Sequence, residues 1–164
     1  MGCAGPEWVA THEPRAYPAY LAKAGYTAAF FGKYLNAYGG SGHGDEALSH
    51  VPPGWSNWVG LRGNSAYYGY TLSVNGTAEP HGQDYHQDYL TDLLANRSVA
   101  WLQQQLGGGK GGKGDPLACV VHTPAPHRSV DTVALFFFSC RHCHLHHVHR
   151  SPIACAHLLW GSVR

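Results

Sequence analysis

The sequence predicts an α/β fold, and three features indicate it. Residues 15–24 have the composition of a short helix, with Pro18 in the first turn, where a missing N–H is tolerated, and Gly25 as the stop signal. Residues 26–34 follow at once and are aromatic and apolar, as expected of a strand buried on both faces. Residues 116–123 form a second run of this kind. Helices that lead into buried strands are typical of an α/β domain.

Between the two strands the sequence first predicts a loop and then a hairpin. Residues 35–58 are rich in glycine and contain a pair of prolines, which indicates a loop. Residues 67–74 and 77–81 flank Asn75-Gly76, the pair that type I′ turns prefer. A β-hairpin is therefore expected here.

A long helix is predicted over residues 84–105. Its aspartates lie in the N-terminal half, where the helix dipole favours them. The glycine-rich residues 106–114 are expected to form a linker or a loop tip before the second strand. The apolar residues that recur at helical spacing, and so indicate this helix, are Tyr85, Tyr89, Leu93, Val99 and Leu102.

The character of the sequence changes after residue 128. No acidic residue follows Asp131, and the last part of the chain shows neither helical nor strand periodicity. We therefore expect two parts, a folded domain over residues 15–128 and an unrelated or disordered His- and Cys-rich tail over residues 129–164.

The composition limits the classes of partner. The formal net charge of +1 creates no overall field that would attract nucleic acid or a membrane surface. The longest apolar run, residues 133–138, is too short to span a bilayer, and residues 1–8 lack the features of a signal peptide. We expect no nucleic-acid partner and no membrane span. Asn75 and Asn96 begin N-x-[ST] sequons, so they are candidate glycosylation sites of a secretory protein.

Four stretches of the sequence, taken in order, carry a resemblance to a known family. They are residues 21–36 (LAKAGYTAAFFGKYLN), residues 50–58 (HVPPGWSNW), residues 67–96 with YTLSVNG and DYLTDLLAN, and residues 123–127 (TPAPH). Together they resemble sulfatases that act on glucosamine-6-sulfate and heparan sulfate, members of the alkaline-phosphatase-like superfamily. The resemblance implies a fragment of the N-terminal domain of such a sulfatase, with a β-hairpin insertion.

The resemblance also implies a chemistry. Such sulfuric ester hydrolases cleave sulfate monoesters on sulfated carbohydrates, with a formylglycine nucleophile made from a C/S-x-P-x-R motif and a calcium ion held by carboxylates. Positioned cations and a hydrogen-bond donor to the leaving oxygen stabilise the charge that develops. The partner implied is a sulfated glycan, and the location is the secretory pathway, lysosomal or extracellular.

Three residues match functional positions of that family. Lys33 matches the lysine that touches the sulfate and the nucleophile, and His127 matches the histidine on the sulfate or the leaving-group oxygen, where it can donate a proton. Asn36 is either a substrate contact or the cap of a turn. His122 is interpreted as a packing residue at a strand end. Because Lys33 and His127 each follow a buried strand, we expect their side chains within roughly 10 Å at one sheet edge.

The sequence also departs from the family. It has no C/S-x-P-x-R motif, since the stretch that begins at Cys3 has its proline one place late and lacks the arginine. Most of the family's calcium ligands are absent as well, so no metal ligand is assigned. The chain is therefore expected to be a gene fragment or an incomplete gene model that is inactive by itself.

Two other classes of function stay open. A non-catalytic glycan-binding module would use the aromatic side chains of Trp55, Trp58, Tyr67, Tyr68 and Tyr70, although aromatics this dense more often form a core. A zinc-binding protein would use the tail, although the regular second ligand pair of structural zinc sites is missing there. The ligands available to zinc would be Cys140, Cys143, His144, His146, His147 and His149.

Overall fold

The protein has a mixed α/β fold, as the sequence predicts. The computed structural model describes residues 5–40, 48–106 and 116–123, and the backbone of residues 133–138. The helices are α1 (Pro6–Thr11), the 3₁₀ helix η1 (Glu13–Arg15), α2 (Tyr17–Lys23), α3 (Tyr85–Asp88) and α4 (Leu90–Leu106). The strands are β1 (Thr27–Lys33), β2 (Asn57–Leu61), β3 (Thr71–Val74), β4 (Thr77–Pro80), β5 (Leu117–His122) and β6 (Val133–Phe138).

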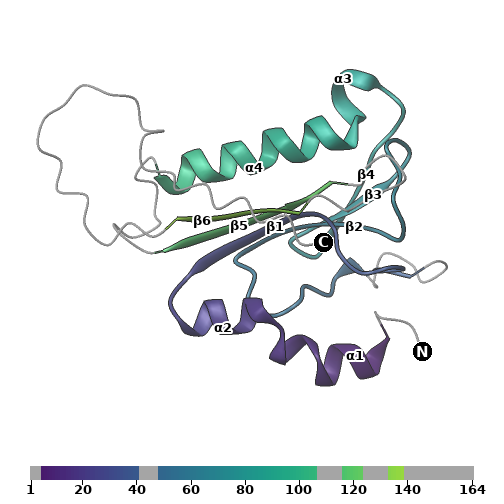
Figure 1. Ribbon diagram of the computed structural model, residues 1–164. Coiled ribbons are helices and arrows are strands. Elements are labelled where there is room, and N and C mark those ends of the chain that lie inside the picture. The colour runs from purple at the N-terminus through teal and green to yellow at the C-terminus, as the bar shows by residue number, and fades with distance from the viewer. Residues whose placement is uncertain (1–4, 41–47, 107–115, 124–132, 139–164) are drawn as a thin grey trace, which may run out of the picture.

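One mixed sheet of six strands organises the described residues, in the order β4-β3-β2-β1-β5-β6. β1 is central and runs parallel to both β2 and β5, while β3, β4 and β6 pair antiparallel with their neighbours. α4 covers one face of the sheet, and α1 and α2 lie on the other (Figure 1). The carboxyl ends of β1, β2 and β5 therefore share one edge, where ligands of such sheets bind.

The two faces of β1 are buried in two separate hydrophobic clusters. Ala29 and Phe31 face the α4 side, where Leu90, Leu94 and Trp101 of α4 join them. Phe30 lies in the opposite cluster, whose other buried members are Tyr38, Leu48, Trp58 and Val120. This double burial confirms the prediction for residues 26–34.

The predicted hairpin is formed by β3 and β4. Asn75 and Gly76 have φ angles of 50° and 88°, as a type I′ turn requires. The Asn75 side chain also accepts a hydrogen bond from the backbone N–H of Trp58, at 2.8 Å, and so ties the turn to β2. The hairpin thus forms one edge of the main sheet. That it is an insertion relative to the superfamily stays a prediction.

The predicted helix over residues 84–105 is interrupted, and its apolar positions are only partly turned to the core. Leu93 and Leu102 pack against the core cluster that contains Phe31. The chain leaves helical geometry at Tyr89, where ψ is 109°. Side chains at Tyr85 and Val99 are more than half exposed as a result. A break of one residue rotates everything after it relative to the first turn, because side-chain direction advances about 100° per residue. The side chains of α4 that turn inward are Leu90, Leu94, Ser98 and Trp101.

Several elements were not predicted. β2 begins at Asn57, inside the predicted loop over residues 35–58, so the end of that loop is wrong. α1 and η1 precede the first predicted helix. β6 pairs with β5 in the region assigned to the tail, whereas residues 139–164 lie outside the described residues. No helix among the described residues is long and apolar enough to cross a bilayer.

A charged cluster joins the hairpin to α4 and gives a pH-dependent prediction. Arg97 donates hydrogen bonds to the Glu79 carboxylate, and His81 Nε2 lies 2.8 Å from the same group. Burial opposes ionisation, but the Arg97 and His81 contacts outweigh it and lower the pKa of Glu79 below 4.5. A lowered folded-state pKa contributes stability above the unfolded-state value, and this contribution is lost as the pH falls through the folded-state value.

We therefore expect Arg97→Met to destabilise the protein at about pH 7 by up to about 1 kcal/mol, because the pair is partly exposed. The loss should shrink as the pH falls through the folded-state pKa of Glu79, which a series of urea unfolding measurements from about pH 7 downward would follow. Gln104→Met, on the exposed side of α4, is the matched control and should show no pH-dependent difference. A loss for Arg97→Met that stays the same down to the pH at which the protein unfolds without urea would contradict the prediction.

Candidate anion-binding site at the carboxyl edge of the sheet

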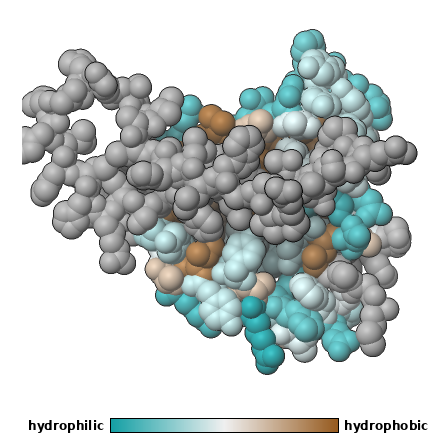
Figure 2. Space-filling model, viewed as in Figure 1, coloured by the Kyte–Doolittle hydropathy of each residue, from teal (hydrophilic) through white to brown (hydrophobic). Residues whose placement is uncertain are grey.

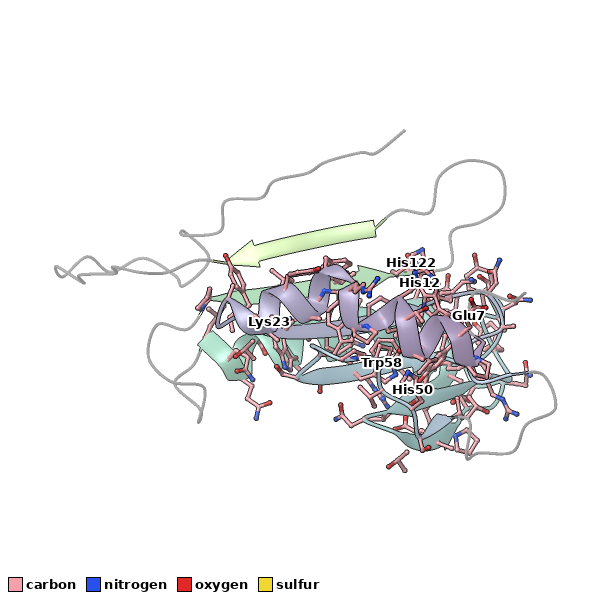
Figure 3. The ribbon with its side chains drawn as sticks, turned by 90° about the horizontal axis from the view of Figure 1, so that it is seen from below. Glu7, His12, Lys23, His50, Trp58 and His122 are labelled. Atoms are coloured by element: carbon pink, nitrogen blue, oxygen red, sulfur yellow. The ribbon has the colours of Figure 1, made fainter. Side chains whose placement is uncertain are left out.

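The candidate site lies where β1 and β5 end side by side. In the parallel register Gly32 pairs with Gly60 of β2 and with His122 of β5, so Lys33 and His122 are neighbours at the same edge. Figure 3 views this region from the side of α1 and α2, with His122 labelled near α1. The sheet thus presents one lysine and one histidine at the edge where α/β proteins bind ligands.

An unusually close backbone approach fixes the two strand ends. Gly32 has a φ of +122°, and a Cβ atom at this position would lie 1.9 Å from the carbonyl oxygen of His122. Only glycine fits here. His122 Nδ1 lies 2.5 Å from the carbonyl oxygen of Lys33, and since a carbonyl can only accept, Nδ1 is the donor. His122 is therefore a strand-end residue, as predicted, and it holds the backbone of Lys33.

The structure brings Lys33 and Asn36 together. Lys33 Nζ donates to Asn36 Oδ1 at 2.6 Å, across a turn in which Ala37 has a φ of 59°. An ammonium group has three N–H donors, and this hydrogen bond uses one of them. The half-buried lysine is thus oriented by Asn36 while it keeps donors for an anion. This contact does not test the predicted substrate role of Asn36. His127 lies outside the described residues, so its predicted closeness to Lys33 stays a prediction.

Beneath the turn is a buried carboxylate that the sequence analysis did not find. Glu13 is 2% exposed, its Oε2 lies 2.6 Å from His50 Nε2, and its Oε1 accepts from the Tyr34 hydroxyl at 3.4 Å. Burial and the charge of Glu13 raise the pKa of the Tyr34 phenol. Since Tyr34 follows Lys33 directly, this network anchors the turn. His50 opens one of the family-like stretches, but nothing in the sequence distinguished Glu13.

We expect Glu13→Gln to destabilise the protein by about 1–3 kcal/mol, because it disturbs the hydrogen bonds of a buried acceptor. A double-mutant cycle with His50→Ala should give a coupling of about 1 kcal/mol, modest because His50 is 37% exposed. Urea unfolding of the four proteins would measure it. Tyr34→Phe is the control. It removes only the 3.4 Å hydrogen bond to Glu13, so it should lower the free energy of unfolding by less. Additivity within error would show that the pair is not coupled.

The aromatic residues that could serve a glycan-binding module are largely structural. Trp58 is fully buried and Tyr70 is 5% exposed, so neither can stack on a sugar. Tyr67 and Tyr68 pack on Tyr89, with ring centroids 6.0 and 5.6 Å apart. Among the described aromatic candidates, Trp55 packs its ring on Phe30 at 5.4 Å and so takes part in the packing on the face of the sheet opposite α4.

The two sequons lie in different settings. Asn75 is exposed at the hairpin turn, a position open to modification. Asn96 is exposed but lies within α4, and the hydroxyl of Ser98 in that sequon is directed to the carbonyl of Ala95 at 2.9 Å. Glycosylation at both positions stays a prediction, and an asparagine in a helix departs from the usual surface loop.

The described residues do not fit the calcium site that the resemblance implies. No three of their His, Cys, Asp or Glu side chains are grouped so as to hold a metal ion. Calcium takes six to eight oxygen ligands, whereas Glu13 is engaged by His50 and Tyr34. Cys119 is buried and its pKa is raised to about 12, so its thiol is not a nucleophile at neutral pH. The cysteines and histidines of the predicted zinc cluster lie outside the described residues.

Comparison with known proteins identifies relatives over most of the chain. The chain is 45% identical over 126 residues to the N-acetylglucosamine-6-sulfatase of Homo sapiens, which is 76% of this chain and 21% of that protein. It is 43% identical over 130 residues to the extracellular sulfatase SULF-1 homolog of Drosophila melanogaster, or 79% of this chain and 11% of that protein. A putative extracellular sulfatase Sulf-1 homolog of Caenorhabditis elegans is 39% identical over 136 residues.

The matches cover only a small part of each relative. The chain spans about a fifth or less of the length of the curated proteins that it matches. No protein-family model matches the chain.

Proposed function

Because the matched region belongs to the sulfatase family, we propose that this chain carries the substrate side of a site for sulfate esters on glycans of the glucosamine-6-sulfate type. The observation that supports this proposal best is the position of Lys33. It ends the central strand, its carbonyl accepts a hydrogen bond from the His122 side chain beside the close approach of Gly32 to β5, and its ammonium is oriented by Asn36.

In this proposal Lys33 binds a sulfate oxygen. Sulfate esters carry a delocalised negative charge, and an ammonium that is already oriented loses little entropy on binding it. Asn36 both orients the lysine and contacts the sugar, and His127 donates a proton to the leaving oxygen. The sequence of this chain contains no C/S-x-P-x-R motif, and its described residues do not group as a calcium site, so the proposal covers the binding of the sulfate ester and the proton donation and not the covalent step.

The same family membership supports a location in the secretory pathway, since relatives are named extracellular sulfatases. The glycosylation of Asn75 and Asn96 belongs to this part of the proposal. Mass spectrometry of the protein secreted from eukaryotic cells would detect it.

Binding of a sulfated sugar tests the role of Lys33. We expect N-acetylglucosamine-6-sulfate to shift the amide signals of residues 32–36 and 122 in NMR titrations, and N-acetylglucosamine to leave them unchanged. Lys33→Met should abolish these shifts, whereas Lys23→Met, an exposed lysine on α2, should preserve them. Equal binding of the two sugars would favour the glycan-binding module instead, and unchanged binding by Lys33→Met would contradict the assigned role.

The isolated chain is expected to release no sulfate from aryl sulfates or from N-acetylglucosamine-6-sulfate, even with calcium added. Its sequence contains no C/S-x-P-x-R motif, so no formylglycine can form, and positioning groups alone do not complete covalent catalysis. Ion chromatography of free sulfate after prolonged incubation would measure this, with buffer alone as the reference. Turnover above that reference which Lys33→Met removes would contradict the prediction.

A further inference from the structure

A groove runs between α2 and the sheet on the face opposite α4. Its volume is about 760 Å³. In Figure 2, patches of hydrophobic residues are visible among hydrophilic ones on the lower half of the face shown. Pockets of about 300–1,000 Å³ that are mostly apolar and carry a few polar groups are typical small-molecule sites.

The walls of the groove are mostly apolar and aromatic. α2 contributes Leu21, and the sheet contributes Phe30 and Val120, side chains without a polar group. Aromatic rings that carry one polar atom complete the wall, and they belong to Tyr17, Tyr20, Tyr34 and Trp55. Such rings suit a planar or aliphatic body and can donate a hydrogen bond at its margin.

The charge at the groove favours an anion. Lys33 lines it at the carboxyl edge, beside His122, and no aspartate or glutamate is among the described residues that line it. Lys33 uses one of its donors on Asn36, so the ammonium can donate to a second acceptor. An occupant with an apolar body and one negative group would therefore match both the walls and the end of the groove.

We propose that this groove is a binding site for an amphipathic organic anion, with its apolar body between α2 and β1 and its sulfate, sulfonate or carboxylate on Lys33. The site differs from the proposed sugar site in its apolar walls, and it requires no hydrolysis. The two sites share Lys33, so a ligand in the groove would compete with a sulfated sugar.

A pair of fluorescent probes tests the proposal on the full chain. Anilinonaphthalene sulfonate carries the anion, and phenylnaphthylamine has the same ring system without it. We expect saturable binding of the sulfonate at one site, and about tenfold weaker binding by Lys33→Met, the loss expected of one charge-assisted hydrogen bond. Binding of the neutral probe should change less than about twofold. Lys23→Met, at the far end of α2 from His122 in Figure 3, is the control for charge.

A second pair of variants tests the walls. Ala24 is exposed and lines the groove, so Ala24→Trp should weaken the binding of both probes without disturbing the core. Ala22→Trp, exposed on the same helix and not among the lining residues, should affect neither probe.

The proposal would be overturned if Ala24→Trp bound both probes as the unchanged protein does, or if Lys33→Met weakened the binding of both probes equally. A dissociation constant that rises with protein concentration would overturn it in favour of a second copy of the chain. Loss of the N-acetylglucosamine-6-sulfate shifts in Lys33→Met together with unchanged probe binding would remove this site and leave the sulfatase proposal intact.

Discussion

Replacing Gly32 by alanine is expected to destabilise the protein by more than about 4 kcal/mol, enough to unfold most of it. The new Cβ would lie 1.9 Å from the carbonyl oxygen of His122, and the next two atoms that it would meet also belong to the backbone of β5. A flexible side chain could move away, but a central strand can separate from its neighbour only by losing the parallel hydrogen bonds between them. Far-UV circular dichroism without denaturant and urea unfolding would measure the loss.

Gly25 offers a matched control, because it also has a positive φ, +81°, but a Cβ there would meet no atom within 4 Å. Gly25→Ala should therefore cost only the intrinsic penalty of this backbone conformation, about 1–2 kcal/mol. If the two variants lost the same stability, the close approach of β1 and β5 would not be the cause. A folded Gly32→Ala protein with normal stability would remove the physical basis of the candidate site.

The parts of the fold that the sequence predicted well are those with a local physical cause. Asn75-Gly76 fixes a type I′ turn by its own conformational preference, so the hairpin followed from two residues. The uninterrupted apolar run in β1 required burial on both faces. Gly25 ended the helix before it, with the left-handed φ typical of a residue after the last helical turn.

The errors have a common physical origin in interactions between distant residues. β2 is short and contains Gly60, and it is a strand because β1 and β3 pair with it on both sides. The inward face of α4 depends on the break at Tyr89, near which Leu90 N–H bonds to the carbonyl of Tyr67. Neither contact has a local sequence signal, because β propensity and helix periodicity both yield to tertiary context.

The residues of the candidate site show the same difference between local and long-range signals. Lys33 and Asn36 were found because they lie three residues apart within one family-like stretch, and the structure joins them by a hydrogen bond. Glu13 was missed because its partners, His50 and Tyr34, are 37 and 21 residues away. A buried carboxylate is recognised by its surroundings, which the fold creates.

Replacing Trp58 by alanine is expected to cost about 3–5 kcal/mol, the usual loss for a large buried aromatic side chain. Trp58 is fully buried on the α1 and α2 side of the sheet, and its ring stacks on Phe30 with centroids 4.8 Å apart. The same ring meets Tyr34 and Tyr38 edge-on at 5.2 and 5.5 Å, so it supports the turn that carries Asn36. Thermal and urea unfolding would measure the loss.

Two smaller substitutions test whether Trp58 supports the turn that carries Asn36 or only the stability of the whole protein. Trp58→Phe keeps a ring against Phe30 but loses the indole N–H that donates to the Tyr38 hydroxyl at 3.0 Å. Trp101→Phe makes the same change in the other core, beside Phe31 and α4. Both should cost about 1–2 kcal/mol, but only Trp58→Phe should shift the amide signals of residues 34–40. Equal shifts from the two variants would mean that the turn follows global stability, and then Trp58 would have no particular role in holding Lys33 and Asn36 in place.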